Sequence, residues 1–238
     1  MNELRNYTEL NTMSSDAAQY IKNYISEVLR TQDVFSLILS GGHLLQSLYK
    51  ALFYIDEIQW EKIHFFITDE LCLPQDNEDS NFKNAVSSLL RRTNIPLQNI
   101  HWINTDIVPL KRAATEYEKT LKLYLSRYGN QFDLLLLTLG PDGHIASIFP
   151  GFSAVLEKRK LVVLTEKAIL DPRVQRITMT LPALNKSRKV IYFFSDENCK
   201  TILNEINYRK DDDKFSYPAE HIRATDGEHI WFIFRSGL

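Results

Sequence analysis

This chain of 238 residues contains few cysteines, carries little net charge and has no long apolar run. Its two cysteines, Cys72 and Cys199, are too few for a disulfide framework and lack the paired spacing of metal ligands. The formal net charge of -2 gives no overall attraction to nucleic acid or to an anionic membrane. No segment offers about 18 uncharged apolar residues, and residues 1–20 contain no apolar stretch typical of a secretion signal. We therefore expect a cytoplasmic protein that binds neither nucleic acid nor membrane.

Internal repeats, coiled-coil heptads and low-complexity linkers are absent as well. Hydrophobic residues make up 44% of the chain, which is ordinary for a protein with a substantial core. We therefore expect one domain over residues 1–238, as a monomer or a weak homodimer.

Short apolar runs alternate with helical patterns along the chain. Apolar residues recur at helical spacing after Ser14, Ser15 and Asp16, a cluster that predicts a helix start, and Asp79 and Ser80 can cap a later helix. This alternation predicts an α/β fold with an open, doubly wound, mostly parallel sheet and helices on both faces. We expect helices near residues 14–29, 44–52, 80–90 and 110–128, and strands near 35–40, 63–68, 100–103, 132–139, 161–165, 176–180, 190–195 and 229–234.

The segment Gly140-Pro141-Asp142-Gly143-His144 ends the most hydrophobic of these runs. In an open α/β sheet, ligands bind at the carboxyl ends of the strands, so this turn should face a ligand crevice. An imidazole two residues from a carboxylate can accept a proton from water near neutral pH. A lone histidine is more often structural, but its place at a strand end favours His144 as a general base.

Two more strand ends carry residues suited to a ligand. Gly41 and Gly42 lie between a strand and a helix, where free N–H groups at the helix start can bind a phosphate, although such a pair is often only a turn. Asp69 and Glu70 close another strand, where carboxylates could orient a hydroxyl-rich ligand or merely cap a loop.

Several cations follow the Gly140–His144 turn, and most should be surface charges. We favour Arg176, at the start of an apolar segment, and Lys200, at the start of a helical pattern, as groups that could neutralise a phosphoryl group.

Taken together, the motifs resemble those of the 6-phosphogluconolactonase family, and the match covers most of the chain. Their order and spacing make coincidence improbable, and the Gly140 block is the most specific. The motifs are Leu39-Ser-Gly-Gly42, Phe66-Ile-Thr-Asp-Glu70 with Asp79-Ser-Asn81, Gly140-Pro-Asp-Gly-His-Ile-Ala-Ser-Ile-Phe-Pro-Gly151, and Arg176-Ile-Thr-Met-Thr-Leu-Pro182.

The resemblance implies a Rossmann-like sheet and hydrolysis of 6-phosphoglucono-1,5-lactone in the pentose phosphate pathway. It implies a small phosphorylated sugar lactone as the partner, with no metal and no cofactor. By motif position, His144 would activate water, supported by Asp142 and Asp69. The candidate substrate-binding residues are Gly41, Gly42, His43, Glu70, Asn81, Gly143, Arg176 and Lys200.

The chain departs from the family pattern at two places. The family usually continues its glycine pair with Ser-Thr-Pro, whereas this chain has His43-Leu44-Leu45, and Leu71 stands where Asp-Glu-Arg would place an arginine. Leucine cannot provide the planar hydrogen-bonding fork of arginine, and loss of one charged hydrogen bond costs about 1.5–3 kcal/mol.

These departures leave two alternatives to the lactonase hypothesis. The chain could be a weakened or non-catalytic relative that binds a sugar phosphate, because fold membership does not guarantee activity. It could also be an amino-sugar-phosphate isomerase or deaminase. That resemblance, however, would require Asp-Glu-Tyr at residues 69–71 and an acidic residue where Phe149 stands.

Overall fold

A seven-stranded parallel sheet forms the centre of the computed structural model, which describes residues 2–92, 94–168, 171–195, 201–202, 205 and 217–235. Every neighbouring pair in this sheet is parallel, in the order β1-β10-β9-β6-β2-β3-β5. The strands are β1 (Asn2–Tyr7), β2 (Phe35–Leu39), β3 (Ile63–Ile67), β5 (Ile100–His101), β6 (Phe132–Thr138), β9 (Ser187–Ser195) and β10 (Glu228–Phe234).

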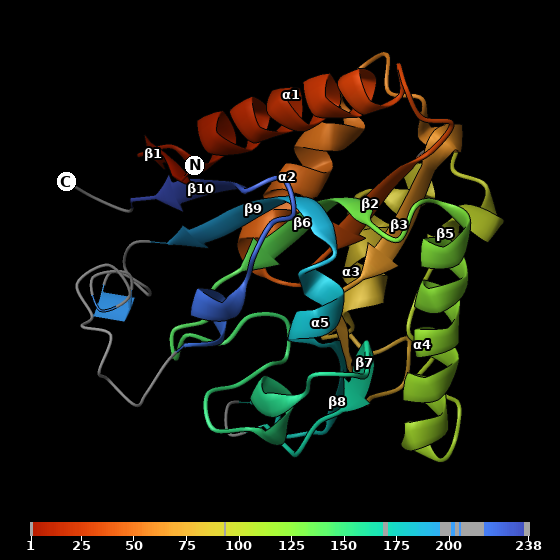
Figure 1. Cartoon of the computed structure of the whole chain (residues 1–238). Coiled ribbons are helices and arrows are strands. Elements are labelled where there is room, and N and C mark those ends of the chain that lie inside the picture. Colours follow the sequence, from red (N-terminus) through yellow and green to blue (C-terminus); the bar gives the residue numbers. More distant parts are fainter. Residues whose placement is uncertain are drawn as a thin grey trace.

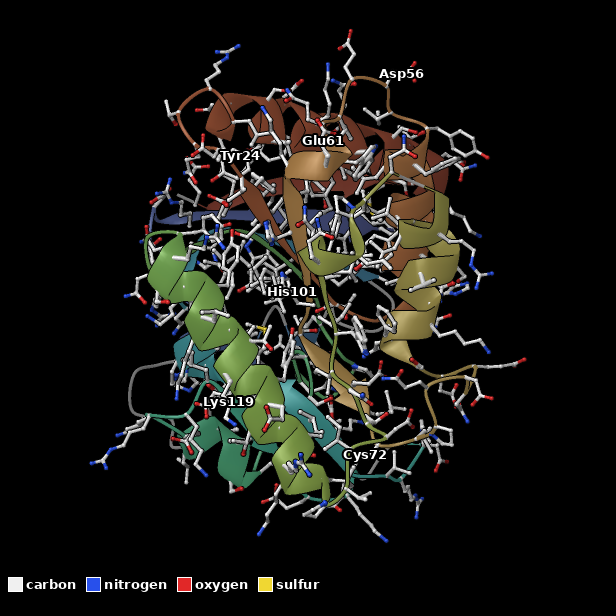
Figure 2. The ribbon with its side chains drawn as sticks, turned by 90° about the vertical axis from the view of Figure 1, so that its right-hand side faces the viewer. Tyr24, Asp56, Glu61, Cys72, His101 and Lys119 are labelled. Carbon is white, nitrogen blue, oxygen red and sulfur yellow. The ribbon has the colours of Figure 1, made fainter. Side chains whose placement is uncertain are left out.

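Helices cover both faces of this sheet, which confirms the predicted fold class (Figure 1). Successive side chains of a strand point to opposite faces, and β6 shows the result. Leu134 and Leu136 pack into the core beneath α1 (Leu10–Val28), α2 (His43–Phe53) and α3 (Asn81–Ser88). Leu135 and Leu137 pack on the other face with α4 (Leu110–Arg127) and α5 (Leu181–Leu184). Figure 2 looks at the molecule from the side of α4.

A second, antiparallel sheet stands apart from the first, in the order β4-β8-β7 (Figure 1). It consists of β4 (Asp69–Leu71), β7 (Val162–Leu164) and β8 (Arg176–Met179). The expected strands near 161–165 and 176–180 therefore exist, but they pair with each other and not with the main sheet. Short 3-10 helices complete the elements: η1 (Trp60–Lys62), η2 (Leu90–Arg92), η3 (Leu97–Asn99), η4 (Ser153–Leu156) and η5 (Pro218–His221).

The start of the first helix differs from the prediction. The helix begins at Leu10 after Glu9, and Ser14 is buried inside it, so the Ser14–Asp16 cluster does not cap it. The later prediction is confirmed, because the Ser80 hydroxyl accepts a hydrogen bond from the Lys83 N–H at 3.0 Å and caps α3. In the described part of the chain, no helix combines the length and apolar character needed to cross a bilayer.

The strand order places the crevice between β2 and β6. From β2 the chain winds outward through β3 to β5, and it then crosses back to β6 and winds the other way through β9 and β10. Ligands of open α/β sheets bind at such a reversal, beyond the carboxyl ends of the strands. The turn containing Gly41 and Gly42 follows β2, and the Gly140–His144 turn follows β6.

Candidate active site

A small cavity of about 200 Å³ lies at the reversal between β2 and β6. A larger cavity of about 480 Å³ lies between α4 and β7, but its described lining has no histidine and none of the candidate site residues, so volume does not locate the site. The small cavity is lined by Ser40, Gly41, Gly42, Asp69, Asn81, Thr138, His144, Ala146 and Arg176.

The imidazole of His144 is held by the carboxylate of Asp142. His144 Nδ1 lies 2.5 Å from Asp142 Oδ1, and the His144 backbone N–H donates to the same oxygen at 3.1 Å. Because a carboxylate only accepts hydrogen bonds, Nδ1 carries the proton, and Nε2 of the neutral ring is left as an acceptor. Burial alone would raise the pKa of Asp142, but the hydrogen bond and charge interaction with His144 outweigh it and lower that pKa. Asp142 is therefore held as a carboxylate, a group that can stabilise an imidazolium at His144.

Close packing fixes the plane of the same ring. A Cβ atom added to Gly140 would lie 2.2 Å from both Cε1 and Nδ1 of His144, so only glycine fits there. On the aromatic side, the ring of Phe149 lies 4.4 Å from the imidazole, centroid to centroid. The turn thus limits the rotation of His144.

The Gly41-Gly42 turn is joined to the end of β6 by a direct hydrogen bond. The Thr138 hydroxyl, at the end of β6, donates to the Gly41 carbonyl at 3.1 Å. Gly42 has a φ of +114° and immediately precedes α2, whose first N–H groups have no partner within the helix. A helix start of this kind binds anions through its N–H groups and its dipole.

Asp69 lies at the base of the cavity in a chain of hydroxyl groups. Its carboxylate accepts hydrogen bonds from Ser147 Oγ at 2.5 Å and Thr68 Oγ1 at 2.7 Å. Thr68 Oγ1 is in turn 2.8 Å from Ser40 Oγ. Because the Thr68 proton points to Asp69, the Ser40 hydroxyl must donate to Thr68, and it presents lone pairs to the cavity. This wall can therefore accept hydrogen bonds from the hydroxyl groups of a sugar.

Asn81 and Arg176 complete the lining from opposite sides. The Asn81 side chain donates to the Asp69 carbonyl at 2.8 Å, and its Oδ1 lies so close to Gly41 that a Cβ there would be 2.0 Å away. Arg176 is paired with Leu71 across β4 and β8, so a guanidinium stands beside the position where the family arginine is missing. Its Nε is buried and has no hydrogen-bond partner in the described part of the chain.

Other candidates from the sequence lie outside this lining. Glu70 has a structural role, because its carboxylate accepts hydrogen bonds from the N–H groups of Asn81 and Phe82, and from the Ser80 hydroxyl, at 2.8–3.0 Å. His43 is exposed on the first turn of α2. Gly143, with a φ of +82°, belongs to the Gly140–His144 turn and packs against Tyr217. Lys200 lies outside the described residues.

Three lining residues, the apolar Ala146 and the polar pair Ser40 and Thr138, were not among the sequence candidates, and the polar pair carries a signal. Each of the pair is a polar residue at the carboxyl end of an apolar strand, the same signal that selected Asp69, so the rule could have found them. In the described part of the chain, no three His, Cys, Asp or Glu side chains come together to hold a metal ion.

Comparisons with known proteins identify the family of the chain. Residues 8–231 match the family model described as glucosamine-6-phosphate isomerases/6-phosphogluconolactonase. A probable 6-phosphogluconolactonase 2 of Arabidopsis thaliana is 36% identical, over 94% of this chain and 89% of its own length. A 6-phosphogluconolactonase of Thermotoga maritima is 33% identical, with 90% of each chain covered.

Solved structures show the same fold. The crystal structure of 6-phosphogluconolactonase from Thermotoga maritima superposes with a TM-score of 0.86 at 29% identity, covering 98% of this chain and 100% of that chain. The 6-phosphogluconolactonase of Trypanosoma cruzi also gives a TM-score of 0.86, at 26% identity, with coverage of 99% and 94%. The chain therefore belongs to the family of glucosamine-6-phosphate isomerases and 6-phosphogluconolactonases.

Proposed function

We propose that this protein hydrolyses 6-phospho-D-glucono-1,5-lactone to 6-phospho-D-gluconate, the lactonase step of the pentose phosphate pathway. The observation that carries the proposal is His144, which is held by Asp142 and lines the same cavity as a glycine turn at a helix start. The family and the names of its relatives support the same reaction.

The reaction requires a base, a site for negative charge and an anchor. His144 Nε2 takes a proton from water while the water oxygen bonds to the lactone carbonyl carbon. Negative charge gathers on the former carbonyl oxygen, where a backbone N–H can stabilise it. When this tetrahedral intermediate collapses, the bond to the ring oxygen breaks, and the imidazolium returns its proton to that oxygen. Asp142 stabilises the imidazolium throughout.

The phosphate anchors the substrate away from the reacting carbon. Gly41, Gly42 and the first N–H groups of α2 provide the anion site, and Arg176 provides a positive charge in the same cavity. Asp69 and Ser40 accept hydrogen bonds from sugar hydroxyl groups. Binding energy from these remote contacts holds the lactone in a reactive orientation.

The test is lactone hydrolysis by the purified protein and by His144→Ala, followed by stopped flow so that the spontaneous reaction can be subtracted. We expect kcat to fall about a hundred- to ten-thousand-fold in the variant. Asp142→Asn should also lower kcat, because an amide cannot stabilise the imidazolium by charge. A wild-type rate no faster than the spontaneous reaction would refute the proposal.

Binding and turnover separate the lactonase from a non-catalytic relative. 6-Phosphogluconate should raise the melting temperature of wild type and of His144→Ala alike, because neither loses the anchor. Stabilisation of wild type without turnover would favour a protein that only binds the sugar phosphate. Ammonia release from glucosamine 6-phosphate would instead favour the deaminase, although Phe149, an uncharged ring, lies against His144 where that family has an acid.

We also propose that the protein works in the cytoplasm, as one domain and as a monomer or a weak homodimer. The scarcity of cysteine and the ordinary composition support these assignments. Sedimentation at several concentrations tests the oligomeric state, and a fluorescent fusion tests the location.

A further inference from the structure

The ring of Phe149 lies behind the cavity and contacts two of its functional groups. It is 2% exposed, and its centroid lies 4.4 Å from that of His144. The guanidinium carbon of Arg176 lies 5.5 Å from the centroid of the same ring. One buried side chain thus packs against both the base and the cation of the site.

Arg176 is oriented by this ring rather than by an acid. In the described residues no carboxylate forms an ion pair with Arg176, and its Nε has no hydrogen-bond partner. An aromatic face attracts a guanidinium without neutralising it, whereas a carboxylate would compete with an anionic ligand. Phe149 therefore holds Arg176 while leaving its charge available to the substrate.

The same ring leaves one nitrogen of His144 free to react. The imidazole lies between Gly140 and Phe149, and Asp142 binds Nδ1. An apolar ring offers no hydrogen-bonding group to Nε2, and the described residues show no hydrogen bond to this atom, which leaves it available to water. A polar side chain in place of Phe149 could pair with it instead.

We propose that Phe149 is a positioning residue that holds His144 and Arg176 at a fixed separation, so that both act on one bound lactone. The proposal rests on the lactonase function. Through His144 it sets kcat, and through Arg176 it sets the affinity for the phosphorylated ligand.

The experiment compares Phe149→Leu with Phe152→Leu. Phe152 is a matched control, because its ring contacts Phe149 at 5.1 Å and no contact with His144 or Arg176 is seen among the described residues. We expect Phe149→Leu to lower kcat about tenfold or more and to weaken 6-phosphogluconate binding several-fold. Phe152→Leu should stay within about twofold of wild type in both. Phe149→Met, whose unbranched side chain adapts better to an irregular space, repeats the test if the leucine variant does not fold.

A double-mutant cycle with Arg176→Gln measures the coupling between Phe149 and Arg176 in the affinity for 6-phosphogluconate. A loss of packing alone would not produce this coupling. Arg176→Gln by itself should weaken 6-phosphogluconate binding, and adding Phe149→Leu should then change the affinity by no more than about twofold. If the two substitutions weakened binding independently, their fold-losses of affinity would multiply in the double variant, and this result would overturn the proposal. The proposal would also fail if Phe149→Leu had a lower melting temperature but normal kinetics. It would fail as well if Phe149→Leu and Phe152→Leu lost equal amounts of kcat and of affinity. A wild type that binds 6-phosphogluconate without turnover would refute the lactonase, while the binding cycle would still test the contact with Arg176.

Discussion

At the scale of single residues, the site depends on the absence of a side chain at Gly140. The imidazole of His144 fills the space that a Cβ atom would occupy, at a separation of 2.2 Å, which no pair of non-bonded atoms tolerates. One of the two must move, and His144 is the more mobile group. If His144 is the base, the glycine therefore affects catalysis through the position of the imidazole.

We predict that Gly140→Ala lowers kcat by about ten- to a hundredfold, because displacing a reacting group by about 1 Å costs this much. Binding of 6-phosphogluconate should change less, because the Gly41-Gly42 anchor lies on a different turn, between β2 and α2. Gly129→Ala is the control: its Cβ would enter open space, although its φ of +91° strains the backbone. We expect that control to lose stability but keep kcat. Equal kcat in Gly140→Ala and wild type, from steady-state kinetics, would contradict the prediction.

Sequence position alone could not separate Asp69 from its neighbour Glu70. Both end a strand, but side chains alternate between the two faces of a strand. Asp69 thus reaches the cavity, while Glu70 turns to the start of α3. The register of the small strand β4, which the sequence did not predict, decides which acid reaches the ligand.

At the scale of elements, Glu70 fastens α3 to the site. Its carboxylate receives N–H groups from the first turn of α3, and α3 begins with Asn81, which lines the cavity. Burial is the main influence on this carboxyl and raises its pKa, against the effect of these hydrogen bonds.

We predict that Glu70→Gln lowers the free energy of unfolding by about 2 kcal/mol, because the new amide N–H₂ faces other donors and leaves buried groups unsatisfied. The KM for the lactone should rise as Asn81 shifts. Glu78→Gln, an exposed acid in the preceding loop, should change stability by less than about 0.5 kcal/mol. Urea denaturation compares the two variants, and equal midpoints would rule out the role of Glu70.

A pair of histidines joins β3 to β5, the strand at the edge of the main sheet. His64 Nδ1 and His101 Nε2 are 3.0 Å apart, among the rings of Phe66 and Tyr124. Figure 2 shows His101 beside α4. Burial, together with repulsion from His64, lowers the pKa of His101 to about 4, and burial also lowers the pKa of His64.

This pair should make the fold sensitive to acid. Between pH about 6.5 and 4 the unfolded chain binds a proton that folded His101 does not, so stability is present above this window and is lost as the pH falls through it. We predict a loss of about 2 kcal/mol for His101, allowing for its partial exposure. Denaturation at pH 7, 6, 5 and 4 should show a shallower pH dependence in His101→Gln than in wild type. Parallel curves would exclude His101 as the cause.

At the scale of the whole molecule, one sheet unites two cores. Adjacent residues Leu135 and Leu136 of β6 are both fully buried, on opposite faces. Because both cores share the same strands, neither should unfold separately.

We predict that Leu135→Ala and Leu136→Ala each lower the free energy of unfolding by about 2–5 kcal/mol and that each shifts a single transition. Leu123→Ala, at an exposed position on α4, is the control and should have almost no effect. Far-ultraviolet circular dichroism and tryptophan fluorescence should give the same midpoint. A split into two transitions in either core variant would show that the faces are independent.

The sequence predicted the fold class because the central strands are continuously apolar and are separated by amphipathic helices. It did not predict β1, whose residues Asn2–Tyr7 are mostly polar and lie at the edge of the sheet, where burial does not select apolar residues. It also could not tell which strands form the small sheet, because apolar residues near 161–165 would suit either sheet. Strands that are far apart in the sequence can pair without any local sequence pattern that reveals their partner.

The hydrogen bond between Thr138 and Gly41 joins the ends of two adjacent strands. Neighbouring strands lie about 4.8 Å apart, and the glycine turn and His144 line one cavity of about 200 Å³, which suits one sugar ring better than two. A lactone with an additional sugar unit between its phosphate and its carbonyl would overshoot His144. Substrate length is therefore set by the geometry of the backbone, and side-chain substitutions alone should not adapt this protein to longer sugars.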